Sequence, residues 1–471
     1  MKNQFVKQFE NNIKFTYSCF DRVIVRGYIR RFFSLGVVAV FLKAMGFTKK
    51  LKAFYVSSLI NSMLIFLRKH QKNNIPILWW PSFDGGKNGA KHQYVARHYS
   101  EKFSGEGNQV FCIITDKEPV QTIASKELKS KTGRLFTKFY NARKPVKQYY
   151  IYFHDAVLGG PCYLKISSYL PFQSEFYFNG HNYIKQVLDK KGIDYRMKEN
   201  AIVDVKNPEI IPGLNKELEG RIVKERIDYW MNRFFKFDKG TYSTRSKHLK
   251  HEWYLSQVEV CSNVIFKSSK FCTSLFERLL DKFTRIGLPY SIAMLFGKRP
   301  ARSKSKTSVR LYDNYACLKH WFRGNSIKQY NKTGYFIRTE TTINNPKSLG
   351  LKKPVLYLQS YLWNGVGSND RLLNCCSDID LSTLTDGETD IFTKPVLDNR
   401  NNKVTAPDLR KDRQVVLFEE LLKPKYLING FKTVDLKNVL KDHFRNSAQV
   451  RYELKKLIAR DIIIKMKNKS F

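Results

Sequence analysis

The sequence predicts a multidomain protein of the α/β (α+β) class, in which mixed-sheet domains follow a helical N-terminal region and precede a small helical C-terminal domain. Three observations predict this architecture. The 471 residues are enough for two to four domains. Between residues 71 and 365, short apolar or aromatic runs bounded by turns alternate with helical patterns. Near the C-terminus lie three amphipathic segments, two of them preceded by a polar capping residue.

The charge balance indicates which kind of partner the protein binds. The chain carries 83 Lys and Arg against 41 Asp and Glu, a formal net charge of +42. Self-repulsion of this size destabilises a compact protein unless a polyanion offsets it, and nucleic acid is the most abundant polyanion. We therefore expect DNA as the first partner and RNA as the second. The alternative is a basic protein that is merely soluble or binds anionic membranes.

The cysteines and the N-terminus bear on location. The 8 Cys are scattered without any Cys-x-x-Cys pair, which is typical of reduced thiols in the cytoplasm. No signal-peptide pattern opens the chain, and the apolar runs at 35–42 and 54–67 are too short or too interrupted to span a bilayer. These features predict a cytoplasmic, nucleoid-associated bacterial protein with no membrane partner.

Changes in composition along the chain predict five parts. Residues 1–70 are expected to be a basic helical region, because apolar residues recur three and four apart, as at Leu35 and Val38. Arginines of this region such as Arg22 either contact phosphates or form a solvated helix face. The other four parts are a mixed α/β domain at 71–205, a basic, nuclease-like sheet domain at 206–365, an acidic linker at 366–410 and a helical domain at 411–471.

The domain at 411–471 has the clearest local pattern. Its expected elements are a helix at Gln414–Leu422, a helix at Val434–His443 capped by Thr433, a helix at Ala448–Arg460 capped by Ser447 and a strand at Ile462–Met466. This order predicts a winged helix and resembles the winged-helix DNA-binding regulators of bacteria. The whole chain also resembles bacterial proteins that share this C-terminal module.

In a winged helix the third helix enters the major groove of DNA. The residues that would contact DNA from this helix and the following turn are Gln449, Arg451, Tyr452, Lys455, Lys456 and Lys467. Arg and Gln side chains pair bidentately with guanine and adenine edges. The alternative is a helical module that docks on protein or RNA through an exposed basic face.

A second pattern, in the basic sheet domain, predicts chemistry. Segment 298–353 has fourteen basic and two acidic residues, which suits a phosphate-binding surface. On strands, Lys328 and Tyr330 share one face, and so do Arg338 and Glu340. Glu259 lies on an earlier strand and shares a face with Asn263. A divalent cation held by Glu259 and Glu340 would polarise a phosphodiester, and Tyr330 would attack its phosphorus.

This pattern resembles the rolling-circle replication initiators and the related relaxases, over residues of about 250–345. The resemblance implies a Mg²⁺ or Mn²⁺ ion if the protein is catalytic, and otherwise no cofactor. It also implies nucleic-acid contacts by basic residues of the same segment: Lys328, Lys332, Arg338 and Arg323. The sequence departs from the family pattern, because it has no His-hydrophobic-His metal motif and has Glu259 and Asn263 where Asp is common.

Alternatives remain at each step. Four further tyrosines compete with Tyr330 as the nucleophile: Tyr254, Tyr312, Tyr315 and Tyr335. Glu259 and Glu340 could also pair with Lys or Arg in an ordinary basic sheet. Three functions are therefore open: a metal-dependent DNA strand-nicking enzyme of a mobile element, a non-catalytic DNA-binding regulator or accessory factor, and a protein partner of a structured RNA. Clustering of Glu259, Glu340 and Tyr330 favours the first, and separation by more than ~10 Å favours the others.

Overall fold

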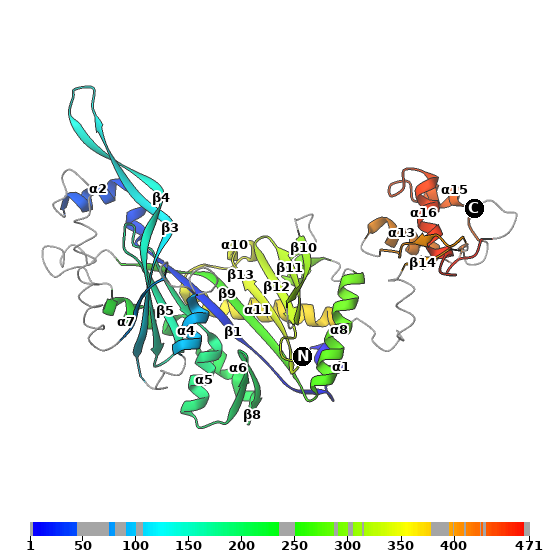
Figure 1. Cartoon of the computed structure of the whole chain (residues 1–471), viewed down its shortest axis with the longest axis horizontal. Coiled ribbons are helices and arrows are strands. Elements are labelled where there is room, and N and C mark those ends of the chain that lie inside the picture. The colour runs from blue at the N-terminus through cyan, green and yellow to red at the C-terminus, as the bar shows by residue number, and fades with distance from the viewer. Residues whose placement is uncertain are drawn as a thin grey trace.

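The computed structural model describes residues 3–44, 75–80, 91–99, 107–234, 250–286, 291–299, 305–312, 315–377, 395–398, 400–408, 411–423, 425–426 and 430–465. These residues form a mixed α/β fold, which confirms the predicted class (Figure 1). The apolar run at 54–67 and Lys467 lie outside the described residues. Among the helices described, none is both long and apolar enough to cross a membrane.

One sheet dominates the fold. Its eleven strands follow the order β10-β11-β12-β13-β9-β1-β6-β5-β4-β3-β2, and neighbours are antiparallel except for the parallel pair β2 and β3. The strands are β1 Ile13–Tyr28, β2 Ile77–Trp79, β3 Gln109–Lys129, β4 Leu135–Asp155, β5 Gly159–Ser167, β6 Ser174–Phe178, β9 Glu252–Phe266, β10 Ser305–Tyr312, β11 Tyr315–Phe322, β12 Asn325–Tyr330 and β13 Phe336–Ile343. The predicted parts 1–70, 71–205 and 206–365 therefore contribute strands to the same sheet.

The first of these strands corrects the expectation of a helical N-terminus. Residues 13–28 form β1, and only α1 (Gln4–Gln8), a short 3-10 turn at Arg30–Phe33 and α2 (Leu35–Ala44) are helical in the described part of the first seventy residues. The physical reason is the period: Ile13, Phe15, Tyr17 and Cys19 alternate with polar residues, and a two-residue period suits a strand with one buried face.

Helices cover the sheet. Along β9 and β13 the covering helix is α11 (Leu358–Ser377), whose Gly365 leaves room for Val260 and whose Asn369 amide donates to the carbonyl of Val260. From Val258 to Val264 the even-numbered residues of β9 are thus buried on the side of α11, and the odd-numbered residues face the opposite side of the sheet. Residues 366–377 belong to this helix, so the acidic linker does not begin at 366, and residues 378–394 lie outside the described residues.

The other described elements are helices, 3-10 turns and two small hairpins. The helices are α4 Lys91–Tyr99, α5 Gly180–Lys190, α6 Ile211–Glu217, α7 Gly220–Phe234, α8 Ser269–Ile286, α9 Ile292–Leu295 and α10 Pro346–Leu349, with 3-10 turns at Pro208–Ile210 and Val355–Tyr357. Two small hairpins stand apart from the large sheet: β7 Tyr195–Lys198 with β8 Ala201–Val205, and β14 Val396–Leu397 with β15 Lys403–Val404.

The hairpin of β3 and β4 extends well beyond its neighbours in the sheet (Figure 1). We call its outer part, residues 126–140, the arm. A turn at Ser130–Gly133 closes it, and Gly133 has a φ of +75°, a conformation that glycine adopts without strain. Between residues 126 and 140 there are five Lys and Arg and one acidic residue, Glu127. The arm therefore projects a concentrated positive charge.

The C-terminal part contains the three predicted helices as α13 (Asp412–Leu421), α15 (Thr433–Val439) and α16 (Ser447–Ile458). Their apolar faces meet in a small core of their own that includes Leu417, Leu436 and Leu454. Asn446, not Ser447, caps α16, because its side-chain oxygen accepts from the backbone N–H of Gln449. Residues 462–465 form no strand, so the wing that would complete a winged helix is absent from the described residues.

Candidate functional site

Three carboxylates converge on the face of the sheet opposite α11. In β9 and β13, Glu340 lies opposite Cys261, two residue pairs away from Glu259. In β1 a bulge between Phe20 and Arg22 inserts Asp21 as an extra residue beside Glu259. One carboxylate oxygen from each of Asp21, Glu259 and Glu340 lies within 4.8 Å of the others. Three strands that are adjacent in the sheet but distant in sequence thus form one acidic cluster.

Basic side chains partly balance this cluster. Lys328 on β12 lies directly opposite Glu340, and its Nζ is 2.7 Å from Glu340 Oε1. Arg22 Nε is 3.9 Å from Glu259 Oε2. Burial and the Asp21 charge nevertheless raise the pKa of Glu340 to about 8, although Lys328 acts against this rise. The three carboxylates therefore repel one another, these two basic groups offset the repulsion only in part, and a bound cation would relieve it.

Tyr330 lies beside the same carboxylates. Its hydroxyl donates a hydrogen bond of 3.0 Å to Glu340 Oε2. Burial and the Glu340 charge raise the pKa of Tyr330 well above its ordinary value, so the phenol keeps its proton at neutral pH. Of the competing tyrosines, Tyr254 donates instead to Glu252, while Tyr312 stacks on Tyr315 with ring centroids 4.7 Å apart. The structure thus brings Glu259, Glu340 and Tyr330 together, as the clustering criterion required.

Asp21 is held in place by neighbours outside the acidic cluster. The tip of the β7–β8 hairpin covers it, and the Asn200 amide donates to Asp21 Oδ1 over 2.6 Å. His181, in the first turn of α5, brings Nδ1 to 3.2 Å from the same oxygen. Burial alone raises the pKa of Asp21, yet His181 and Arg338 hold it well below its usual range. Asp21 is therefore a fixed carboxylate anion at the centre of the site.

Arg338 has a different place from the one expected. It was predicted to contact nucleic acid, but it is buried, and its Nε donates to Asn263 Oδ1 over 2.7 Å. Its Nη1 lies 3.6 Å from Asp21 Oδ1. Because these neighbours surround the guanidinium, Arg338 helps to orient Asp21 and Asn263 from within the protein. It does not lie on the surface where DNA would bind.

The other predicted contacts in the sheet domain are more exposed. Lys332 is 40% exposed and pairs with Glu199 at 2.6 Å. Arg323 is exposed in the β11–β12 turn, where its φ is +47°, at the end of the hairpin opposite Tyr330. Lys328 is 27% exposed beside Lys319, whose pKa burial and the Lys328 charge lower. Lys328, Lys319 and Arg22 therefore form a basic rim around the acidic cluster.

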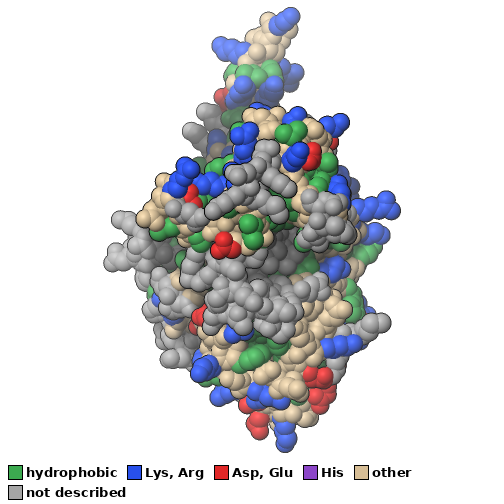
Figure 2. Space-filling model, turned by 90° about the vertical axis from the view of Figure 1, so that its right-hand side faces the viewer, with side chains coloured by type: hydrophobic (Ala, Val, Ile, Leu, Met, Phe, Trp, Pro, Cys, Tyr) green, Lys and Arg blue, Asp and Glu red, His purple; other side chains and the backbone are tan. Residues whose placement is uncertain are grey.

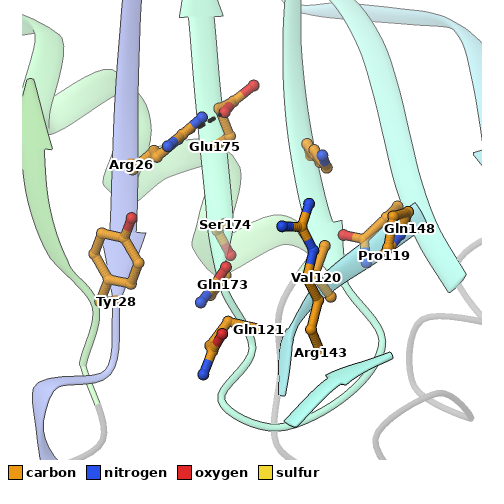
Figure 3. Close-up of a pocket in the computed structure, with 11 residues that line it drawn as sticks. Arg26, Tyr28, Pro119, Val120, Gln121, Arg143, Gln148, Gln173, Ser174 and Glu175 are labelled. Atoms are coloured by element: carbon orange, nitrogen blue, oxygen red, sulfur yellow. Dashed lines mark hydrogen bonds and ion pairs between the residues drawn. The ribbon is translucent and has the colours of Figure 1, made fainter. Parts of the chain in front are cut away.

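The same sheet face continues from this rim into a shallow cavity of about 320 Å³ (Figure 3). Arg26 and Arg143 point into it, and Arg26 Nε donates to Glu175 Oε2 over 3.0 Å. Gln121, Gln148 and Gln173 add polar groups to its lining. Charged and amide side chains that face a shallow, open cavity suit a polar chain with phosphates better than an apolar ligand.

The predicted contacts of the C-terminal part separate into two groups. Arg451 and Tyr452 are exposed on α16, and Gln449 is partly exposed and accepts from the Arg445 N–H. Lys456, in contrast, is buried and paired with Glu453 at 2.7 Å, so its expected exposure is wrong. Lys455 is exposed but pairs with Asp398 at 2.9 Å. The helical period assigned Lys456 to the surface because it gives no account of the buried Glu453 beside it.

Four residues near the site were missed by the sequence reasoning: Asp21, His181, Cys19 and Cys261. The signal that could have found Asp21 is the strict alternation from Ile13 to Cys19, which marks a strand and draws attention to the first acid that follows. No local signal places His181 there, because it reaches the site only through the β1–β6 pairing that positions the start of α5.

Comparisons with known proteins give little. No family model and no curated protein matches this sequence. Among solved structures, the rolling-circle replication initiator protein from Geobacillus stearothermophilus matches with 10% identity and a TM-score of 0.19. The match covers 40% of this chain and 54% of that chain, about half of its length. A TM-score this low carries no argument about fold or function.

Proposed function

We propose that this protein is a metal-dependent DNA strand-nicking enzyme in which Tyr330 is the nucleophile. One observation carries the proposal: Tyr330 donates to Glu340, which converges with Asp21 and Glu259 on one face of a basic sheet. Each carboxylate has a cation nearby: Lys328 lies 2.7 Å from Glu340, Arg338 lies 3.6 Å from Asp21 and Arg22 lies 3.9 Å from Glu259. Ion pairing alone does not require three carboxylates to lie within 4.8 Å of one another, where they repel.

The cluster fits a hard divalent cation. Mg²⁺ and Mn²⁺ take oxygen ligands, and in an octahedral Mg²⁺ site with bonds of about 2.1 Å the ligand oxygens lie roughly 3–4 Å apart. The three carboxylate oxygens lie within 4.8 Å of one another, so a small contraction would suffice. Asp21, Glu259 and Glu340 would hold the ion, and the ion would polarise the phosphodiester that is to be cut.

The protein's own groups account for the rest of the reaction. The Tyr330 oxygen attacks phosphorus and forms the phosphotyrosine bond, while the bond from phosphorus to the 3′ oxygen of the preceding nucleotide breaks. Glu340 in its ionised form accepts the phenol proton along the existing hydrogen bond, and its pKa of about 8 makes it a stronger base than an ordinary carboxylate. Lys328, at the edge of the cluster, is placed to stabilise the additional negative charge on the phosphoryl oxygens. The 3′ oxygen leaves and takes a proton from solvent.

Two further surfaces suit the binding of DNA around this centre. The basic rim and the cavity lined by Arg26 and Arg143 extend the reacting face across the sheet. The arm carries its basic side chains on a two-stranded ribbon, a shape that enters a major groove. Figure 2 looks at the molecule from another side, where the arm is still the uppermost part and Lys and Arg side chains surround it. The arm would thus hold duplex beside the strand being cut.

A nicking assay with end-labelled DNA tests the proposal. Single- and double-stranded pools of random sequence would be incubated with Mg²⁺, Mn²⁺ or EDTA, beside a structured RNA. A strand labelled at its 3′ end should leave its label on the protein in a denaturing gel, and the same strand labelled at its 5′ end should release a free fragment that a polymerase extends. EDTA should prevent both products.

Two variants assign the product to the site. Tyr330→Phe should lose the covalent adduct, and Tyr315→Phe, which removes a neighbouring hydroxyl from the same surface, should keep it. Cleavage without an adduct would contradict the role of Tyr330. Salt-sensitive binding without cleavage would leave a non-catalytic DNA-binding protein, and a preference for the structured RNA would favour the third function.

A further inference from the structure

A second group of ligand atoms lies beneath the acidic cluster, on the same pair of strands. Cys19 on β1 and Cys261 on β9 are directly opposite each other, and their sulfur atoms are 3.6 Å apart. His181 Nε2 lies 3.3 Å from Cys19 Sγ and 3.8 Å from Cys261 Sγ. All three side chains are fully buried. The proposed nicking reaction uses none of them.

These distances are those of a tetrahedral metal site. With Zn–S bonds of about 2.3 Å and Zn–N bonds of about 2.0–2.1 Å, tetrahedral geometry sets two sulfurs about 3.8 Å apart and a sulfur and a nitrogen about 3.6 Å apart. The observed S···S distance of 3.6 Å is slightly shorter than expected, and the S···N distances of 3.3 and 3.8 Å lie on either side of the expected value. The three atoms are therefore spaced nearly as three corners of such a tetrahedron.

The surroundings of His181 suit a metal ligand. Its Nδ1 faces Asp21 at 3.2 Å, and a proton on Nδ1 leaves the lone pair of Nε2 directed toward the two sulfurs. A ligating histidine usually donates its other N–H to a carboxylate or carbonyl in this way. The Tyr17 hydroxyl lies 3.3 Å from Nε2, close to the remaining corner, and accepts from the backbone N–H of Ile202.

We propose that Cys19, Cys261 and His181 bind a zinc ion, with the Tyr17 oxygen next to the fourth position. Both thiols lose their protons when the ion binds, so that two thiolates balance its two positive charges. The ion would tie β1, β9 and the start of α5 together below Asp21. This proposal does not depend on the nicking activity, because thiolates select zinc whereas the three carboxylates select Mg²⁺ or Mn²⁺.

Metal analysis of the full-length protein tests the proposal. The chain would be purified under reducing conditions without added metal, and its zinc content measured by mass spectrometry. We expect one zinc per chain in the wild type and its loss in Cys19→Ser, Cys261→Ser and His181→Asn. Cys272→Ser removes a buried thiol from α8 and should keep the zinc. Glu259→Gln alters the acidic cluster and should also keep it, which separates the two metal sites.

If these variants fail to fold, metal measurements on the wild type alone still decide the test. Replacement of the zinc by Co²⁺ should give the strong visible bands of a tetrahedral site and a thiolate-to-cobalt band in the near ultraviolet. A wild type that takes up neither metal at this site, or whose Cys19 and Cys261 form a disulfide under the same conditions, would overturn the proposal. A zinc-loaded protein that does not nick DNA would refute the proposed activity and leave the zinc site intact.

Discussion

The centre of the sheet and the arm use the same kinds of charged residue in opposite ways. At the centre, Lys328 and Arg338 are held against carboxylates and are largely or fully buried. On the arm, the five basic residues between 126 and 140 form no ion pair within the described part of the chain. Fixed pairs pre-organise a reaction, whereas free charges attract phosphates and release counterions. A high net positive charge therefore indicates that a protein binds a polyanion. The pairing of each basic residue indicates whether that residue organises a site or contacts the polyanion.

The largest expected effect is at the centre. Removing the Tyr330 hydroxyl with Tyr330→Phe should lower the nicking rate by at least about a thousandfold, as expected when a nucleophile is lost. DNA affinity should change little, because the variant removes one hydroxyl that is already hydrogen-bonded to Glu340 and leaves the basic residues in place. Single-turnover kinetics with saturating DNA measure this, and a variant that still forms the covalent adduct would show that another tyrosine attacks.

A pair of charge-neutralising variants compares the two regions directly. Glu340→Gln removes a proton acceptor and a metal ligand, and should reduce nicking by about 10²–10⁴-fold with near-normal binding. Glu127→Gln removes the one acid of the arm, and should leave nicking unchanged while slightly strengthening binding. The same rate and affinity assays serve both. Equal effects of the two variants on nicking would erase the distinction between centre and arm.

The arm should control affinity and its dependence on salt. Replacing Lys129, Lys131 and Arg134 together by Ala should weaken duplex binding and reduce the slope of log affinity against log salt by about 3 if each contacts one phosphate. The nicking rate at saturating DNA should stay the same. Titrations at several salt concentrations measure the slope, and an unchanged slope would mean that DNA does not reach the arm.

The smallest effects concern stability. At Gly365 an added Cβ would lie 2.5 Å from Val260 Cβ, so Gly365→Ala should separate α11 from β9 and lower the free energy of unfolding by about 1–3 kcal/mol. Gly133→Ala meets no neighbouring atom and strains only the arm turn, where φ is +75°, at about 1 kcal/mol. Denaturant unfolding of the two variants should place the larger loss at Gly365.

The sequence predicted the parts of this molecule that depend on local patterns. The strand at β9 and β13, the shared faces of Lys328 with Tyr330 and of Arg338 with Glu340, and the three C-terminal helices all follow from residue periods. Asp21 and His181 do not, because a bulge and a strand pairing bring them to the site over long sequence distances. The burial of Lys456 could not be predicted from the period of its own helix either. Lys456 pairs with the buried Glu453, and Glu453 also pairs with Arg413 on another helix.

The central pairing of β1 with β9 has a consequence for how the protein is made. Cys19 and Cys261 face each other although 242 residues separate them in the chain. At about 5–20 residues per second, a ribosome needs on the order of tens of seconds to synthesise the residues between them. Until then the edge of β1 that pairs with β9 has no partner strand, and this edge is open to other chains. We therefore expect newborn chains to need a chaperone at high expression, and expression halted before residue 252 to yield aggregates.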